Sequence, residues 1–256
     1  MPMTVVEHQR SPQFSDAEWQ ARLDLAACYR AADLFGFSDI IWNHITSKVP
    51  GTEHFLINRF GYRFDEVTAS NLVTIDQDGN TINPGSGESE IDVNVTGFVI
   101  HGAVHRARAD VHCVMHSHSD GGMAVSALKD GLVPMQIDGM VFYNRVAYHD
   151  FEGQSDDIEE CERIAASLSD HPVMILRNHG LLTCGKTVGE AFMLMYYLER
   201  ACNVQLQAMA TGREIALRRA GVCARTAEGL DRFPLGRYEW PAILRQVESE
   251  CRDDTE

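Results

Sequence analysis

The sequence predicts a single α/β domain, and three observations support this fold class. The chain has 256 residues, of which 45% are hydrophobic and 23% are charged, so it is long enough to bury a sizeable core. Segments with helical spacing of apolar residues alternate with short segments typical of strands. No internal repeat, low-complexity tract or linker interrupts them. We expect a flexible leader at 1–14, one domain at 15–212, and a C-terminal tail at 213–256 that packs on the domain or on a neighbouring subunit.

The first half of the chain is expected to place short strands between two helices. Ser15 is a candidate N-cap with Glu18 as its capping-box partner, and apolar residues recur at helical spacing as far as Phe37. The segment 83–88 is a loop by composition, and a second helix is expected at 96–106. Strands are expected at 45–49, 54–58, 72–75 and 111–118.

The second half is expected to contain more helix than strand. Ser155 is the candidate N-cap of one of its helices, and the apolar and aromatic stripe of the last helix indicates core packing. A loop with one or two strands is expected at 136–148, and a short buried strand at 173–176. The helices are expected at 120–128, 155–168 and 188–209.

Composition excludes several classes of protein. The formal net charge of −15 argues against a general affinity for nucleic acid or for an anionic membrane. No apolar stretch is long enough to span a bilayer, and the N-terminus lacks a signal peptide pattern. The 7 cysteines are an odd number without a Cys-x-x-Cys pair, which indicates reduced thiols in a cytoplasmic protein.

The most informative motif is His116-Ser117-His118, followed much later by Asn178-His179-Gly180-Leu181. Two histidines at i and i+2 of a strand point to the same face, so both imidazoles can meet one metal ion. A lone buried histidine is more often a hydrogen-bonded core residue, but two on one face need a charge or a donor to satisfy them. A third histidine from a strand-to-helix turn would leave one metal position open for substrate. The pattern predicts a metal-dependent enzyme.

Other motifs carry less weight. His101 and His105 are four residues apart on the expected helix, which is a weak metal signal without an intervening glutamate. His44, His54 and His171 are expected near the surface. The chain has no Walker, Rossmann or Gly-x-Ser-x-Gly signature, so nucleotide binding and serine hydrolase chemistry are disfavoured.

At these residues the chain resembles the class II aldolase/adducin head-domain family, over about 20–210. The resemblance implies a three-layer α/β/α fold around a largely antiparallel sheet, and a cyclic homotetramer with active sites between subunits. It also implies a divalent metal, with zinc foremost and Mn, Fe, Ni or Co as alternatives. The family's three metal ligands fall on His116, His118 and His179. The matching segments are 42–46, 55–61, 109–118, 176–182 and 188–191.

The chain departs from the sugar-phosphate aldolases of that family at several positions. The family's acid/base glutamate falls on Gly97 when residues are counted back from His116 without gaps. Its phosphate-binding turns are replaced around Asn43-His44 and by Phe60-Gly61, and its paired serines read Val95-Thr96. We therefore expect a small, non-phosphorylated carbonyl substrate, and another group must handle the proton.

The acid/base group is left open among several residues. Glu88 and Glu90 lie in the loop before the expected helix, and Asp138 and Tyr143 lie later in the chain. Tyr148 and His149 are further options, including action across a subunit boundary. A general acid or base must come within hydrogen-bond reach of the transferred proton, which sequence alone does not establish.

Three functions are consistent with the sequence. The first is a cytoplasmic lyase of the aldolase type that cleaves or forms a C–C bond beside a carbonyl. The second is a non-haem Fe(II) oxygenase or decarboxylase that acts on a 2-oxo acid at the same three histidines. The third is a non-catalytic oligomerisation module like the adducin head, against which the intact ligand set argues.

Overall fold

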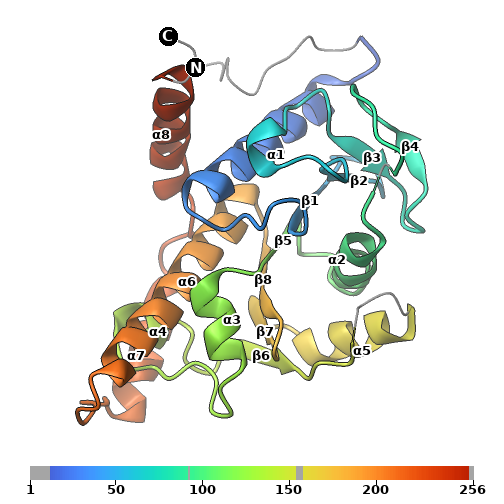
Figure 1. Ribbon diagram of the computed structural model, residues 1–256. Coiled ribbons are helices and arrows are strands. Elements are labelled where there is room, and N and C mark those ends of the chain that lie inside the picture. Colours follow the sequence, from blue (N-terminus) through green and yellow to red (C-terminus); the bar gives the residue numbers. More distant parts are fainter. Residues whose placement is uncertain (1–11, 92, 154–157, 254–256) are drawn as a thin grey trace.

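The computed structural model describes residues 12–91, 93–153 and 158–253, and these form three layers (Figure 1). A sheet lies in the middle. Helices α2 (Val95–Ala107) and α5 (Ile158–Leu168) pack together on one face, and α1 (Asp16–Leu34) and α6 (Val188–Ala210) cover the other. The three-layer α/β/α expectation is confirmed. The shorter and later helices are η1 (Phe64–Glu66), α3 (Asp120–Ser126), α4 (Ile137–Val141), α7 (Ala220–Leu230) and α8 (Glu239–Asp253).

The sheet has eight strands in the order β4-β3-β2-β1-β5-β8-β7-β6. All neighbouring pairs are antiparallel except β6 and β7, which are parallel, so the sheet is largely antiparallel as expected. The central position of β5 places its histidines in the middle of the molecule. The strands are β1 (His44–Lys48), β2 (Phe55–Ile57), β3 (Val73–Ile75), β4 (Thr81–Asn83), β5 (Cys113–Ser117), β6 (Val146–His149), β7 (Val173–Leu176) and β8 (Gly180–Gly185).

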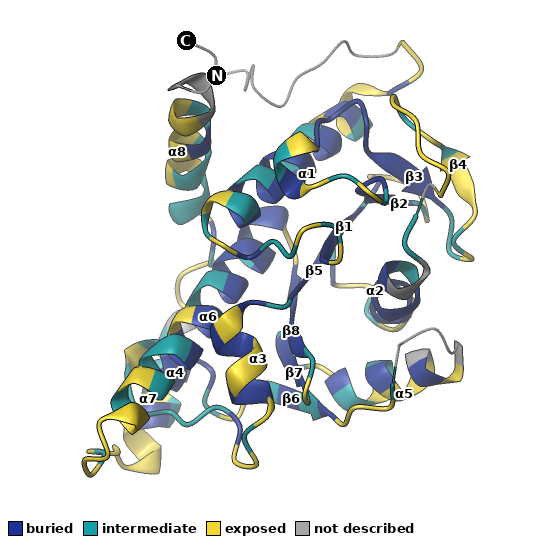
Figure 2. Ribbon diagram, in the orientation of Figure 1, coloured by how far each residue is buried: buried dark blue, intermediate teal, exposed yellow. Residues whose placement is uncertain are grey.

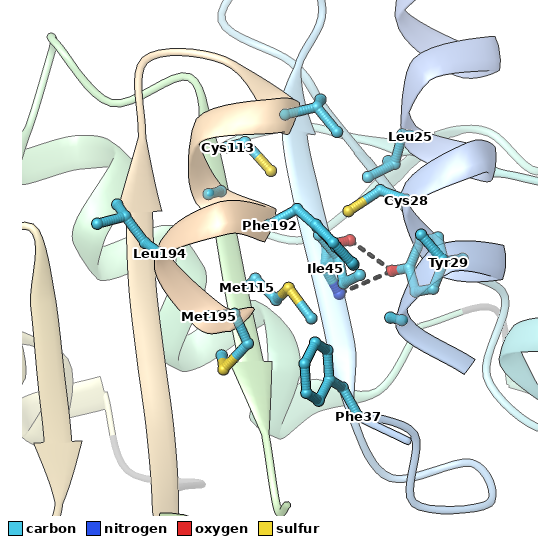
Figure 3. Packing of buried hydrophobic residues seen from close by; sticks show 14 of the residues in the cluster. Leu25, Cys28, Tyr29, Phe37, Ile45, Cys113, Met115, Phe192, Leu194 and Met195 are labelled. Carbon is cyan, nitrogen blue, oxygen red and sulfur yellow. Dashed lines mark hydrogen bonds between the residues drawn. The ribbon is translucent and has the colours of Figure 1, made fainter. Parts of the chain in front are cut away.

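The main core fills the space between the sheet and helices α1 and α6 (Figures 2 and 3). Tyr29 of α1 anchors this layer to the sheet, because its hydroxyl contacts the backbone carbonyl of Ile45 and accepts from the Ile45 backbone N–H at 2.8 Å. Phe192 of α6 is fully buried against the same layer. A second cluster, which includes Val104, Val114 and Ile164, joins the opposite face to α2 and α5. Strands β5, β7 and β8 therefore contribute alternate residues to the two cores.

Free thiols are part of these cores. Burial raises the pKa of the Cys28, Cys113 and Cys202 thiols well above the ordinary value, and it raises the pKa of Cys184 to about 12. A thiol with a raised pKa carries almost no thiolate at neutral pH, so these side chains behave as small apolar groups. The buried free cysteines among the described residues are Cys28, Cys113, Cys184, Cys202 and Cys223.

Hydroxyl side chains cap the N-termini of the two long helices α1 and α6. The Ser15 side chain accepts from the Glu18 backbone N–H at 3.1 Å, which confirms the start of α1. Thr187 caps α6 in the same way, accepting from the Glu190 backbone at 3.1 Å. The proposed N-cap Ser155 and most of the expected leader lie outside the described residues.

Four segments differ from the sequence expectations. The loop expected at 83–88 is preceded by the edge strand β4, and the segment 136–148 contains the short helix α4 as well as β6. The segment after His179 is strand β8 rather than the start of a helix. The segment after 212, expected to pack on the domain or on a neighbouring subunit, packs on the domain and differs only in forming helices: α7 packs on α4, and α8 packs on α1 and α6. None of the helices among the described residues has the length and apolar character needed to span a membrane.

Candidate metal centre

His116 and His118 lie on one face at the end of β5. In the sheet register His116 pairs with His44 of β1 and with Leu182 of β8. The ring centroids of His116 and His118 are 4.7 Å apart, which is the same-face arrangement that the i, i+2 spacing predicts. The strand therefore places two imidazoles at the end of the central sheet, one buried and one half-buried.

His179 joins them from the short turn between β7 and β8, not from the strand-to-helix turn that the sequence suggested. Its backbone N–H donates to the Leu176 carbonyl at 3.1 Å, and Asn178 has a φ of 55°. Asparagine is one of the few side chains that adopt this left-handed conformation readily. At Gly180 an added Cβ would lie 2.5 Å from the Ser117 carbonyl oxygen. The Asn-His-Gly motif thus permits both the turn and the close pairing of β8 with β5.

The three rings turn the same atom inward. The Nε2 atom of His118 lies 2.9 Å from Nε2 of His116 and 3.0 Å from Nε2 of His179. Candidate ligand atoms of all three residues lie within 4.8 Å of one another. Three nitrogen atoms contributed by β5 and the distant β7–β8 turn therefore face one shared point.

The outward nitrogen atoms of two rings are held by acceptors. His116 Nδ1 donates to the Leu181 carbonyl at 2.9 Å, and His118 Nδ1 donates to the Asp39 carboxylate at 2.9 Å. A proton on Nδ1 leaves the Nε2 lone pair free, which is the tautomer that a metal ligand requires. Burial also lowers the pKa of His116 well below its ordinary value and that of His179 to about 4, so both rings are neutral near pH 7.

This donor set fits a divalent metal. Zinc binds imidazole nitrogen at about 2.0–2.1 Å, so two ligands in a tetrahedron lie about 3.3 Å apart, a few tenths longer than the separations found here. Bare lone pairs this close repel one another without a shared cation or proton. The three histidines can therefore hold a metal, and a three-nitrogen cap leaves a fourth position for substrate.

The segment after His118 is fixed by Glu199 of α6. This buried carboxylate accepts from the Ser119 hydroxyl at 2.5 Å and from the backbone N–H groups of Gly121 and Gly122 at 2.9 and 2.7 Å. A carboxylate at a helix N-terminus satisfies otherwise unpaired N–H groups and complements the helix dipole. Glu199 therefore fixes the start of α3 next to a candidate metal ligand.

A row of buried polar side chains lies beside the centre, and it corrects the expectation that His44 is near the surface. His44 is only 2% exposed, and its Nδ1 lies 3.0 Å from His101 Nε2. The Thr46 hydroxyl lies 2.9 Å from His101 Nδ1 and 2.8 Å from His105 Nε2. The i, i+4 histidines of α2 thus face β1 rather than a separate metal.

Burial keeps this row neutral. It lowers the pKa of His44 and of His101 well below the ordinary value, and it lowers the pKa of His105 to about 3 against a smaller opposing effect of the Val111 backbone. Neighbouring histidines add to the lowering. The row consists of hydrogen-bonded neutral imidazoles.

Gly97 supplies the space for His44. A Cβ added at Gly97 would lie 2.8 Å from His44 Cδ2 and 2.9 Å from His44 Cγ, closer than real contacts allow. The imidazole of His44 therefore lies against the position where a side chain of residue 97 would begin. The sequence showed that Gly97 stands where the family has its acid/base glutamate. It gave no local sign that His44 pairs with His116 across the two strands and lies against this position.

The expected acid/base candidates lie elsewhere in the protomer. Glu88 and Glu90 are exposed in the loop before α2, and Asp138 forms an ion pair with Arg200 at 3.2 Å. Tyr143 is half-buried in the turn after α4. Among the described residues, no contact joins any of these four to the three histidines. A catalytic role for them stays a prediction that needs a neighbouring subunit.

The two further options are occupied by structural contacts. The Tyr148 hydroxyl accepts from the Leu132 backbone N–H at 3.0 Å. His149 Nδ1 lies 3.1 Å from the Ser167 hydroxyl. Asp39, which the sequence gave no reason to single out, is the acidic side chain that contacts the candidate ligand His118 directly. The two residues are 79 positions apart in the sequence.

A polar groove of about 460 Å³ opens beside His118. Its lining includes the carboxylates of Asp39, Asp120 and Glu199, with Phe35 and Phe37 on the apolar side. A larger hollow of about 930 Å³ lies between the start of α6 and the C-terminal helices, and none of the three histidines lines it. Of the three histidines, His118 lines the smaller groove, which therefore lies beside the candidate centre.

The fold and the site define an α/β/α protein with a candidate three-histidine centre. The sequence model of the Class II Aldolase and Adducin N-terminal domain matches residues 23–206. The chain belongs to the class II aldolase and adducin family.

Solved structures and a curated relative support this assignment. An aldolase II superfamily protein from Pseudomonas syringae is 44% identical, with a TM-score of 0.88 over 93% of this chain and 96% of that one. An L-fuculose 1-phosphate aldolase from Glaciozyma antarctica PI12 is 30% identical, with a TM-score of 0.84 over 98% and 97% of the two chains. Alpha-adducin of Rattus norvegicus is 37% identical over 97% of this chain and 36% of its own length.

Proposed function

We propose that this protein is a divalent-metal-dependent lyase of the aldolase type, acting on a non-phosphorylated carbonyl substrate. One observation carries the proposal: three Nε2 atoms face one point, while acceptors hold the outward Nδ1 atoms of His116 and His118. A structural histidine cluster has no need of such a shared orientation. Membership of the class II aldolase and adducin family supports the same reaction class.

The chemistry follows from the donor set. A divalent cation held by His116, His118 and His179 would act as a Lewis acid and stabilise negative charge as the bond beside the carbonyl breaks. Leu181 and Asp39 orient two of the imidazoles for that task. Imidazole suits zinc best, and Mn, Fe, Ni or Co can also occupy such sites.

The surroundings of the centre favour a substrate without a phosphate group. Carboxylates of Asp39 and Asp120 line the adjoining groove and would repel a phosphate dianion. Two residues before His44 in the sequence, Trp42 forms a tilted aromatic pair with Phe60, with ring centroids 5.9 Å apart, and Trp42 is 53% exposed. An aromatic surface suits an apolar or aromatic part of the substrate.

The proposal includes a homotetramer with active sites between subunits, in the cytoplasm. Exposed apolar side chains near the centre support assembly. Ile40 follows Asp39 directly, and the ring centroids of Phe151 and His179 are 6.3 Å apart. Such side chains are covered when a second subunit packs on them. Buried thiols suit a reducing compartment. Light scattering after size exclusion tests the assembly, and a monomer at micromolar concentration contradicts it.

The metal-dependent reaction is tested by metal analysis together with a panel of substrates. We expect one divalent ion per chain, and retro-aldol cleavage of unphosphorylated hydroxy-ketones or hydroxy-oxo-acids that a chelator abolishes and zinc restores. Paired phosphorylated substrates should react more slowly. Cleavage that survives replacement of all three histidines, or a preference for the phosphorylated member of each pair, overturns the proposal.

Two rivals have their own support. The likeness to alpha-adducin over 97% of this chain favours a non-catalytic module, which predicts a protein that neither binds zinc nor gains stability from it. Glycine at position 97 is also compatible with an Fe(II) oxygenase or decarboxylase that acts on a 2-oxo acid. Oxygen consumption by the Fe(II)-loaded protein distinguishes this rival, because a lyase consumes none.

A further inference from the structure

The first half of helix α3 is tied to the two candidate ligands of β5. The helix packs on α6 and on β8 (Figure 1). It begins two residues after His118, and Glu199 holds the backbone of its first turn. A Cβ added at Gly122 would lie 2.5 Å from Leu181 Cγ, so the helix lies directly on Leu181. The carbonyl of Leu181 accepts from His116 Nδ1, so α3 also packs against the residue that orients His116.

The other end of α3 meets the turn that carries His179. The Ser126 carbonyl, at the last residue of the helix, accepts from the backbone N–H of Asn178 at 3.3 Å. Carbonyl groups at a helix end have no partner within the helix, so a donor from outside satisfies this one. The bond is longer than the usual range of about 2.7–3.2 Å and is therefore weak. A second link is needed to hold the turn firmly against the helix.

Arg177 supplies this second link. Its Nη1 donates to the Leu128 carbonyl, two residues beyond the end of α3, at 2.6 Å. Its guanidinium carbon lies 4.3 Å from the centroid of the Tyr148 ring, which is a cation–π contact with β6. The Arg177 backbone N–H donates to the His149 carbonyl at 2.8 Å. The residue therefore connects the turn of His179 both to β6 and to the segment that leaves α3.

The loop after α3 is held at a second place that does not involve Arg177. The Tyr148 hydroxyl accepts from the Leu132 backbone N–H at 3.0 Å. A Cβ added at Gly131 would lie 2.5 Å from the same hydroxyl oxygen, so glycine allows the loop to approach Tyr148 this closely. Loss of the Arg177 side chain therefore leaves the far end of the loop attached. What it removes is the link between the end of α3, at Leu128, and the turn of His179.

We propose that Arg177 is a positioning residue of the metal centre. It locks the end of α3 to the turn of His179, and α3 is tied at its other end to the two ligands of β5. The spacing between His179 and those two ligands then depends on the bond from Arg177 to Leu128. The inference rests on the metal site of the function proposed above and not on its reaction. Since the guanidinium is engaged by Leu128 and Tyr148, Arg177 acts through His179 and not on the metal itself.

The test compares zinc affinities of the full-length chain by competition with a fluorescent chelator. Arg177→Met keeps a long side chain and removes the donor. We expect its affinity to be about tenfold lower, at the small end of the range for groups that support metal ligands. Arg177→Gln, with a shorter polar side chain, repeats the loss and should match Arg177→Met. It also serves as the readout if Arg177→Met does not fold.

Arg177→Lys is the conservative variant. The bond to the Leu128 carbonyl needs a single donor, which the Lys ammonium group supplies, so its zinc affinity should stay within about threefold of the wild type. This rescue separates the role of the bond from the bulk of the side chain. An Arg177→Lys protein as weak as Arg177→Met overturns the assignment of the effect to the Leu128 bond.

Arg145→Met is the matched control. Arg145 is also half-buried, and its guanidinium donates to the Asp231 carboxylate at 2.8 and 2.7 Å. It lines the larger hollow, which none of the three histidines lines. Its replacement should lower the urea midpoint of the protein but leave zinc affinity unchanged. A general loss of stability would then be excluded as the cause of weaker zinc binding in Arg177→Met.

A double-mutant cycle determines whether Arg177 acts through His179. In a His179→Ala background no imidazole is left for Arg177 to position. Arg177→Met should then lower the remaining zinc affinity by less than about twofold, because two residues that act through one contact are not additive. A loss as large as in the wild-type background overturns the proposal, since Arg177 would then act by another route.

Failure of this role is distinguishable from failure of the metal site. Equal zinc affinities of the wild type, Arg177→Met and Arg177→Gln overturn the role of Arg177 and leave the metal site standing. A wild-type protein that binds no zinc counts against the metal site of the proposed function, and with it against a residue that positions one of its ligands.

Discussion

Asp39 shows how one side chain sets the properties of another. It lies outside the three-histidine cluster, yet its carboxylate accepts from His118 Nδ1 at 2.9 Å and thereby fixes the tautomer and the orientation of that ring. His118 is the central member of the cluster, with short contacts to both other Nε2 atoms. Weakening its orientation therefore affects the whole centre.

Replacing Asp39 with alanine should lower zinc affinity by about 10- to 100-fold, the range seen when hydrogen-bond partners of metal ligands are removed. The reason is that the His118 ring loses its orienting acceptor while all three ligands stay in place. Competition with a fluorescent chelator measures the affinity. Asp130→Ala, at an exposed position, is the matched control; equal affinities in the two variants would contradict the role of Asp39.

At this scale the sequence was enough to single out the three candidate ligands, but not the side chains that contact them. His116 and His118 share a face because of strand geometry, so a local pattern was enough to find them. The contacts of His118 with Asp39 and of His44 with His101 span 79 and 57 residues. Such contacts depend on tertiary packing, which no local spacing encodes.

The pairing of β5 with β8 is the element-level feature that assembles the centre. It brings His116 opposite Leu182, and the turn before β8 carries His179 to the end of β5. Gly180 allows this approach, since a Cβ there would meet the Ser117 backbone oxygen, which has little freedom to move. The metal centre and the strand pairing therefore depend on the same residue.

Gly180→Ala should destabilise the protein by about 1–3 kcal/mol, as overpacked sites do, and should also weaken zinc binding. The added methyl group separates β8 from β5 and moves His179. Urea unfolding and zinc titration provide the two measurements. Gly229→Ala on α7 is the control, because a Cβ there meets nothing within 4 Å. Equal stability of both variants would show that β8 adjusts without cost.

Glu199→Gln should destabilise the protein by about 1–3 kcal/mol, since hydrogen bonds to a charged group are worth roughly that amount. The amide keeps the shape of the carboxylate but can accept with one oxygen only, so the N–H groups at the start of α3 lose a partner. Chemical denaturation with exposed Glu228→Gln as control measures the difference. An unchanged midpoint in Glu199→Gln would mean that another group caps α3.

The elements that sequence reasoning missed share a physical cause. Strand β8 is buried on both faces and bounded by glycines, so it has neither the alternation of a half-exposed strand nor helical spacing to identify it. Helix α4 is only five residues long. Helices α7 and α8 gain their order from packing on α4, α1 and α6, which their own sequences do not reveal.

Across the whole molecule, neutral buried histidines make stability depend on pH. His105 has a pKa of about 3 in the folded chain, against an ordinary value of 6.5, because burial disfavours its charged form. Between these values the unfolded chain binds more protons than the folded one. The free energy of unfolding therefore rises with pH in this window and falls as acid is added.

His105→Phe should reduce this acid sensitivity. One such histidine changes the free energy of unfolding by up to about 1.4 kcal/mol per pH unit, so the variant should lose about that much of the slope between pH 6 and pH 4. Urea unfolding at several pH values, in the presence of a chelator, gives the slopes. Parallel curves for the two proteins would show that His105 is protonated in both states.

The layered architecture follows from length and from alternating elements, which is why the sequence predicted it well. The order of the strands in the sheet could not be predicted in this way, because β5 lies between β1 and β8, neither of which is its neighbour in the chain. Non-local pairings of this kind arise from packing the two cores simultaneously.

The thiols buried in these cores report any opening of the folded chain. Folded, the Cys28, Cys113 and Cys202 thiols are protonated and out of reach, so alkylating reagents and mild oxidants should leave them untouched. Once α1 or α6 lifts from the sheet, each becomes an ordinary reactive group. Alkylation or oxidation of one such thiol would then prevent the helix from packing on the sheet again. The modified thiol would identify a chain that had opened.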